Sequence, residues 1–102
     1  MSRKLLPEVA RKFLGDVEND KKFWVNNGTV LKNLDELLDA LNSMSNDTFQ
    51  YHANSEKNDF SRWIGDVIGD KKLAEDLAKS KNKKSVIKIL EFRINQLKRV
   101  LS

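Results

Sequence analysis

The feature that most constrains the fold is a pair of amphipathic helical segments in residues 51–78, separated by a Gly-Asp step. In both segments apolar residues recur every three or four positions, as on the buried side of an α-helix. The first stripe contains Phe60, Trp63, Ile64, Val67 and Ile68, and the second contains Leu73, Ala74, Leu77 and Ala78. Asn58 or Asp59 is a suitable N-cap for the first helix. Gly69 can adopt the left-handed conformation that ends it, and Asp70 can cap the second helix. The stretch therefore predicts two helices that meet at a tight corner.

Three further helices are predicted before this corner. Pro7 suits the first turn of a helix that continues to about Val17. Asn33, followed three residues later by Glu36, fits a capping-box arrangement for a helix that ends near residue 43. Asp47 is a candidate cap for a short helix that ends near residue 54.

The β-structure predicted for the chain is a hairpin at residues 23–32. Asn26-Asn27-Gly28 separates Phe23-Trp24-Val25 from Thr29-Val30-Leu31, and Asn-Gly between β-forming residues is typical of a turn whose two central residues have positive φ. Phe23 and Trp24 point to opposite faces, so we expect one of them to be exposed. An isolated hairpin is marginally stable in water, so it must pack on helices or pair its edge with another chain.

The blocks FWVNNGTVLKNLDELLDAL and YHANSEKNDFSRWIGDVIGDKKLAEDL together resemble an archaeal domain family of unknown function. Its members carry an aromatic-x-x-Gly hairpin, a Leu-x-Glu-Leu helix, a Phe-x-Tyr-His element and an Asn-Asp-Phe-x-x-Trp-Ile helix followed by Gly-Asp-x-x-Leu-Ala. The resemblance covers roughly Phe23 to Leu77, about half of the chain. It implies no particular activity, cofactor or site, and the basic C-terminal segment lies outside it.

The amino-acid composition limits the classes of protein and of functional site to which this chain can belong. The 102 residues suffice for one domain with a modest core, and 39% hydrophobic with 33% charged residues is typical of a well-solvated helical protein. The absence of cysteine excludes disulfides, thiolate nucleophiles and cysteine-based zinc sites. No apolar run reaches the roughly 18 residues of a membrane span, and residues 1–13 lack a signal peptide's apolar region. We therefore expect a cytoplasmic protein with no membrane contact.

The C-terminal quarter differs from the rest in charge. Its basic residues are Lys79, Lys81, Lys83, Lys84, Lys88, Arg93, Lys98 and Arg99, and its one acidic residue is Glu91. Residues 79–102 thus carry eight positive charges and one negative charge, or +7, whereas residues 1–78 carry 11 and 14, or −3. These eight side chains are candidates for binding the phosphates of nucleic acid or a ribonucleoprotein, with strong salt dependence and little sequence reading.

The same quarter also carries an apolar seam at alternating spacings of three and four. The seam contains Ile87, Leu90, Ile94, Leu97 and Leu101, and Val86, Ile89 and Val100 widen it. Such a seam closes either on its own domain or on a second copy, as in a coiled coil. We interpret it, together with an exposed Trp24, as an interaction surface that favours a homodimer. Trp63 lies on the apolar stripe and is expected in the core.

No catalytic or metal-binding constellation is found in the sequence. His52 could act as a general base oriented by Asp59 or Asp66, but a single histidine beside a helix cap is more often a structural hydrogen-bonding residue. Ser61 and Thr48 lack the context of a nucleophile. Neither an EF-hand loop nor a His-x-x-x-His pair is present, so no metal and no cofactor is predicted.

The sequence therefore predicts a mainly α single domain over residues 1–102, with about five helices. It divides into a compact body at 1–78 with the hairpin at 23–32, and a long basic amphipathic helix at 79–102. The leading hypothesis is a non-enzymatic interaction module that self-associates and binds a macromolecular partner, either a protein or a phosphate-rich nucleic acid or ribonucleoprotein. The alternatives are a nucleic-acid or ribonucleoprotein binder and, third, a small enzyme using His52 and Asp59.

Overall fold

The computed structural model describes residues 5–80 and 82–102, and it confirms the mainly α architecture. Its helices are α1 (Pro7–Leu14), α2 (Leu34–Ser43), α3 (Asn46–His52), α4 (Asp59–Trp63), α5 (Lys71–Ala78) and α6 (Lys83–Leu101). Strands β1 (Phe23–Trp24) and β2 (Val30–Leu31) form an antiparallel pair. A 3₁₀ turn, η1 (Asn19–Lys21), precedes β1, and a π-helical turn, η2 (Ile64–Ile68), extends α4.

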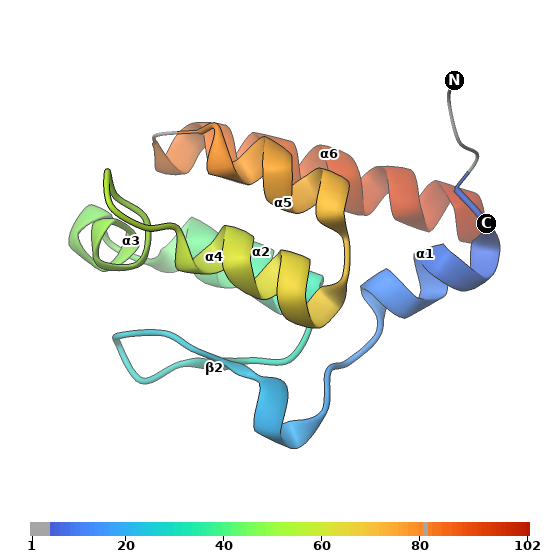
Figure 1. Cartoon of the computed structure of the whole chain (residues 1–102), viewed down its shortest axis with the longest axis horizontal. Coiled ribbons are helices and arrows are strands. Elements are labelled where there is room, and N and C mark those ends of the chain that lie inside the picture. Colours follow the sequence, from blue (N-terminus) through green and yellow to red (C-terminus); the bar gives the residue numbers. More distant parts are fainter. Residues whose placement is uncertain (1–4, 81) are drawn as a thin grey trace.

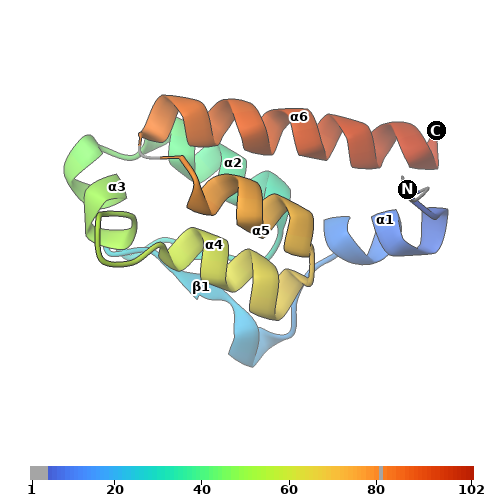
Figure 2. The same cartoon turned by 45° about the horizontal axis from the view of Figure 1, so that its top comes forward.

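Helix α6 spans one side of the molecule, and the hairpin lies on the opposite side (Figure 1). Helices α2, α4 and α5 fill the space between them, and α1 lies along the C-terminal part of α6 (Figure 2). Helix α6 contacts α1, α2 and α5, while α4 packs on α5. The C-terminal helix is therefore part of the compact body rather than an appendage to it. Among the described helices, none combines the length and hydrophobicity that crossing a bilayer requires.

Aromatic rings hold the hairpin against the helices. The Phe23 ring on β1 stacks on Phe60 of α4 at 5.3 Å between centroids and meets Trp63 edge-on at 5.7 Å. Phe60 also stacks on Phe49 of α3 at 5.7 Å. The indole N–H of Trp63 donates to the Lys21 carbonyl at 2.8 Å, so this buried polar group is satisfied. This cluster explains how a two-residue strand pair is stable here, and it confirms Trp63 as a core residue.

The predicted corner between α4 and α5 is present. Asn58, and not Asp59, caps α4 by accepting from the Ser61 N–H at 3.0 Å. Gly69 adopts φ of 94°, and its N–H donates to the Ile64 carbonyl at 2.7 Å, which closes the π-helical turn. Asp70 then caps α5 by accepting from the backbone N–H three residues later at 3.2 Å.

The hairpin confirms the predicted strands but not the predicted turn. Phe23 pairs with Leu31 and Trp24 pairs with Val30. Only Gly28 of the loop has positive φ, at 96°, so the expectation of positive φ at two central residues is wrong. Beyond the two strands, the Val25 N–H donates to the Thr29 carbonyl at 2.8 Å, which leaves a loop of three residues, 26–28. A type I turn followed by a left-handed glycine closes a loop of that length.

Two helix ends differ from the predictions. Helix α1 ends at Leu14 because the chain turns away there, and the Val17 N–H donates to the Lys32 carbonyl beyond β2 at 2.8 Å. Ser45 caps α3 by accepting from the Thr48 N–H at 3.1 Å, so Asp47 lies inside the first turn and is not the cap. There its carboxylate still complements the positive end of the helix.

Candidate interaction surface

Helix α6 turns its apolar side toward its own protein. Leu90 and Leu97 are fully buried, and Ile94 is 2% exposed, on the side where α6 contacts α1, α2 and α5. Ile87 is half-buried, and Leu101 in the last turn is 38% exposed. The interpretation of this seam as a pairing surface for a second copy is therefore wrong for its central residues, because they already fill the core of one protomer.

The eight basic residues of the C-terminal quarter do not form one surface. Arg93 donates to both carboxylate oxygens of Asp70 at 2.7 and 2.9 Å, so its guanidinium is engaged within the protein, which argues against the predicted phosphate contact. Lys83 donates to a backbone carbonyl at the end of α2 at 2.7 Å, and Lys98 donates to Asp35 of α2 at 3.1 Å. The exposed members are Lys79, Lys84, Lys88, Lys98 and Arg99, and Lys81 lies outside the described residues.

The predictions from sequence missed Phe92, which is 72% exposed. It lies on the side of α6 opposite the seam, so its ring faces solvent rather than the core. Exposed large apolar side chains on a well-packed helix are candidate contact points for a partner. The signal in the sequence is an aromatic residue placed on the polar face of an otherwise regular amphipathic helix.

Phe92 stands in a groove of about 460 Å³ between α5 and α6. Lys72 and Asp76 of α5 line it together with Lys79, the C-cap of that helix, at i, i+4 and i+7, and the buried Leu73 lies beneath them. From α6, its lining residues are Lys88, Ile89, Phe92, Arg93 and Gln96. The groove thus has an apolar floor and a rim that is mainly cationic.

The charges of the rim are only partly neutralised within the protein. Lys72 pairs with Asp76 at 3.3 Å along α5, and Arg93 pairs with the buried Asp70. Among the described residues, no carboxylate lies within ion-pair distance of Lys79 or Lys88. The groove therefore presents two free ammonium groups beside an exposed ring, an arrangement suited to an acidic partner with apolar side chains.

The second exposed aromatic is Trp24, at 71%. Phe23 beside it is buried, which confirms that one member of this pair faces solvent. Trp24 is in β1 and Phe92 is in α6, and the hairpin and α6 lie on opposite sides of the fold (Figure 1). Trp24 and Phe92 therefore belong to two separate surfaces, and Tyr51 of α3, at 55%, is a third exposed aromatic residue.

His52 connects three elements and is only 4% exposed. The backbone N–H of Asn26 in the hairpin loop donates to Nε2 at 2.9 Å, so the ring proton lies on Nδ1. Nδ1 in turn donates to the Asp59 carboxylate at 3.0 Å, which leaves Asp66 without a part in this arrangement. With both ring nitrogens occupied and the ring against Phe60 at 5.4 Å, His52 acts as a structural tie between the hairpin, α3 and α4.

Two opposing effects set the pKa of the Asp59 carboxyl group. Partial burial by itself would raise this pKa. Hydrogen bonds from His52 and from Lys57, whose Nζ lies 3.1 Å away, outweigh burial and hold the pKa below its ordinary value of 3.8. Asp59 is therefore ionised at neutral pH, as its two hydrogen-bond donors require.

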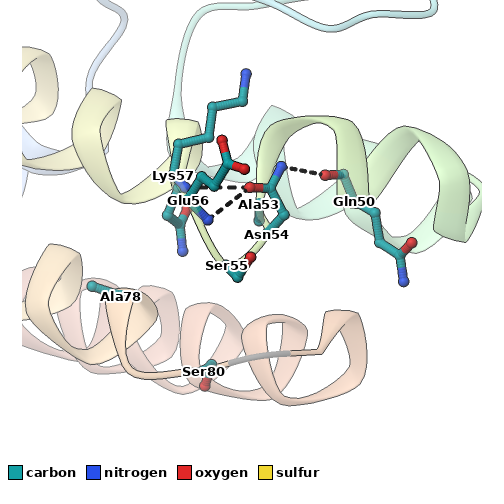
Figure 3. Close-up of a pocket in the computed structure, with 9 residues that line it drawn as sticks. Gln50, Ala53, Asn54, Ser55, Glu56, Lys57, Ala78 and Ser80 are labelled. Atoms are coloured by element: carbon teal, nitrogen blue, oxygen red, sulfur yellow. Dashed lines mark hydrogen bonds between the residues drawn. The ribbon is translucent and has the colours of Figure 1, made fainter.

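A second cavity, of about 570 Å³, lies beside the loop between α3 and α4. Residues 54–57 face Ala78 and Ser80 across it (Figure 3). The Asn54 side-chain oxygen accepts from the N–H groups of Glu56 and Lys57, and its amide donates to the Gln50 carbonyl at 2.9 Å. Because these polar groups satisfy one another, the loop geometry explains the cavity lining without a ligand.

Comparison with known proteins gives one match. The model of a family of unknown function (DUF5752) matches residues 19–79, which run from η1 to the end of α5 and leave α1 and α6 outside. Neither the curated proteins nor the solved structures include a match to the chain. Since the match covers more than half of the sequence, this chain belongs to the family of unknown function DUF5752.

Proposed function

We propose that this chain is a non-enzymatic binding module that contacts a partner protein through the outward face of α6. The observation that carries the proposal is Phe92, 72% exposed on a helix whose opposite side fills the core. Such an exposed ring contributes little to the stability of its own protein, whereas a buried aromatic anchor is a frequent source of binding free energy at an interface. The proposal assigns the hairpin side, with Trp24, to a separate contact.

Self-association through the seam is not part of this proposal, because Leu90, Ile94 and Leu97 are internal. An enzymatic role for His52 is also set aside. Its ring nitrogens are occupied by Asn26 and Asp59, and a general base must reach a substrate proton.

Nucleic-acid binding is the second candidate, favoured by the +7 charge of residues 79–102. Lys84, Lys88 and Arg99 are exposed on α6 and are available for phosphate contacts. With Arg93 held by Asp70, the cationic surface available to phosphate is smaller than the charge count indicates.

Site-specific photocrosslinking tests the proposal. A benzophenone amino acid replaces Phe92 in one variant and the exposed Tyr51 in a matched control, and both are irradiated in the cells that produce the protein. We expect discrete protein adducts at position 92 and none at position 51. RNA adducts at position 92 would favour the second candidate, and an absence of adducts at both positions would contradict a binding function.

Three further expectations belong to the proposal. Residues 1–102 act as one domain, with α6 needed to complete the core. The resemblance carried by the motifs quoted above favours an archaeal source, and the lack of a predicted membrane span or signal peptide favours a cytoplasmic location. An origin outside the archaea would contradict the second expectation.

A further inference from the structure

We infer that the groove between α5 and α6 is a docking site for an acidic amphipathic helix of a partner protein. This inference rests on the proposed function and names the chemistry of the partner. It draws on the shape of the groove, the nature of its floor and the charge of its rim.

The groove is formed in advance of any partner. The short segment 79–82 joins α5 to α6 at one end, and the Asp70–Arg93 ion pair clamps the two helices at the other. Arg93 itself lines the groove, so the clamp fixes part of the binding surface. A site that needs no ordering retains more of its contact free energy on binding.

The floor favours apolar side chains. Leu73 lies at its base, and Ile89 and Phe92 rise from α6 one turn apart. A leucine or aromatic side chain of a partner would bury the exposed Phe92 ring against this floor.

The groove lies between two helices, and its helical walls determine which secondary structure a bound partner can have. Their backbone N–H and C=O groups are used within each helix, so an added strand would find no ladder partners here. Side chains of α5 and of its C-cap, at i, i+4 and i+7, face side chains of α6 at i, i+4 and i+8. A third helix, with its own apolar stripe, fits between such rows.

The rim selects the charge of that helix. Lys79 and Lys88 are without carboxylate partners among the described residues. Acidic side chains that flank the apolar stripe of a partner helix would form ion pairs with both ammonium groups.

Nucleic acid fits this groove less well. A base-stacking surface usually offers several aromatic platforms, whereas Phe92 is the one aromatic ring in the lining, whose other apolar residues are Leu73 and Ile89. The carboxylate of Asp76 also lies in the lining, where it would repel a phosphate.

Fluorescence anisotropy of the full chain tests the inference. The probe is a labelled helical peptide of about 18 residues with leucines on one face and glutamates and alanines on the other. A peptide of the same composition in scrambled order and a labelled single-stranded RNA serve as comparison ligands. We expect saturable binding of the amphipathic peptide that weakens at least about fivefold between about 50 and 300 mM salt.

Four variants assign the binding to the groove. Phe92→Ala and Lys88→Glu should each weaken peptide binding at least about tenfold. Trp24→Ala, an exposed aromatic on the opposite side, and Lys84→Glu, one turn earlier on the same helix and outside the groove lining, should change it less than about threefold. Circular dichroism checks that all four are folded, as the exposure of these side chains predicts.

Three results would overturn the inference. They are no peptide binding at low salt, binding that Phe92→Ala and Lys88→Glu leave unchanged, and RNA binding lost in these variants while the peptide does not bind. Protein adducts at position 92 without peptide binding would leave the proposed function standing and remove only this inference. An absence of adducts would remove the proposed function.

Discussion

Arg93 of α6 binds Asp70, the N-cap of α5, through two hydrogen bonds of 2.7 and 2.9 Å. Asp70 is 1% exposed and the Arg93 side chain is 12% exposed, so the pair is almost completely removed from water. The same carboxylate accepts from the Leu73 N–H, so one residue starts α5 and fixes it to α6. This pair holds the groove that carries Phe92.

Breaking this pair should be costly. Asp70→Asn keeps a good N-cap but leaves the Arg93 guanidinium buried without its counter-ion, and we expect a loss of about 3 kcal/mol in the free energy of unfolding. The double variant Asp70→Asn with Arg93→Met should lose less than the sum of the two single variants. Urea denaturation measures all three, and additive losses would show that the pair is not coupled.

Removing the His52 ring should destabilise the protein. His52→Ala deletes hydrogen bonds to Asn26 and Asp59 and leaves a cavity beside Phe60, so we expect a loss of about 2–3 kcal/mol. Gln50→Ala, at an exposed position on the same helix, is the control and should change stability by less than about 0.5 kcal/mol. Thermal unfolding measures both, and equal melting temperatures would contradict the structural role.

Asp59 makes stability depend on pH in a defined direction. Its pKa is lower in the folded state than the ordinary value of 3.8, so its ionised form contributes stability above that value. The contribution is lost as pH falls through the folded pKa. The difference in unfolding free energy between wild type and Asp59→Asn should therefore be constant above about pH 5 and shrink below about pH 4. A difference that grows on acidification would contradict the lowered pKa.

The hairpin loop depends on one left-handed residue. Gly28 has φ of 96°, and no atom beyond its two chain neighbours lies within 4 Å of where a Cβ would stand, so a substitution there tests backbone strain. Gly28→Ala should cost about 1 kcal/mol, and Gly28→Asn should cost less because asparagine tolerates this conformation better. Equal melting temperatures for the two variants would contradict this explanation.

Local chemistry made much of the fold predictable. Asn58, Gly69 and Asp70 specify the corner between α4 and α5 because caps and left-handed glycines act within a few residues. The hairpin at 23–32 and the seam of α6 follow from spacing in the same way. The family match, residues 19–79, covers the stretch on which the resemblance rests.

The candidate site was less predictable because it depends on tertiary contacts. Nothing near Arg93 in the sequence indicates that Asp70 removes it from the basic surface, since 23 residues separate them. His52 is tied to Asn26 across 26 residues. The seam was correctly identified, but its periodicity is the same whether α6 packs on its own domain or on a second copy, and the preference for a copy was wrong for the central residues.

The groove and its proposed partner depend on which side of α6 faces the core. A pair of variants on that helix measures this orientation. Ile94 is buried and Phe92 is exposed, so urea denaturation should show a loss of about 2–4 kcal/mol for Ile94→Ala and less than about 0.5 kcal/mol for Phe92→Ala. The unfolding midpoint of Ile94→Ala should not change with protein concentration. An equal loss in both variants, or a midpoint that rises with concentration, would contradict the account.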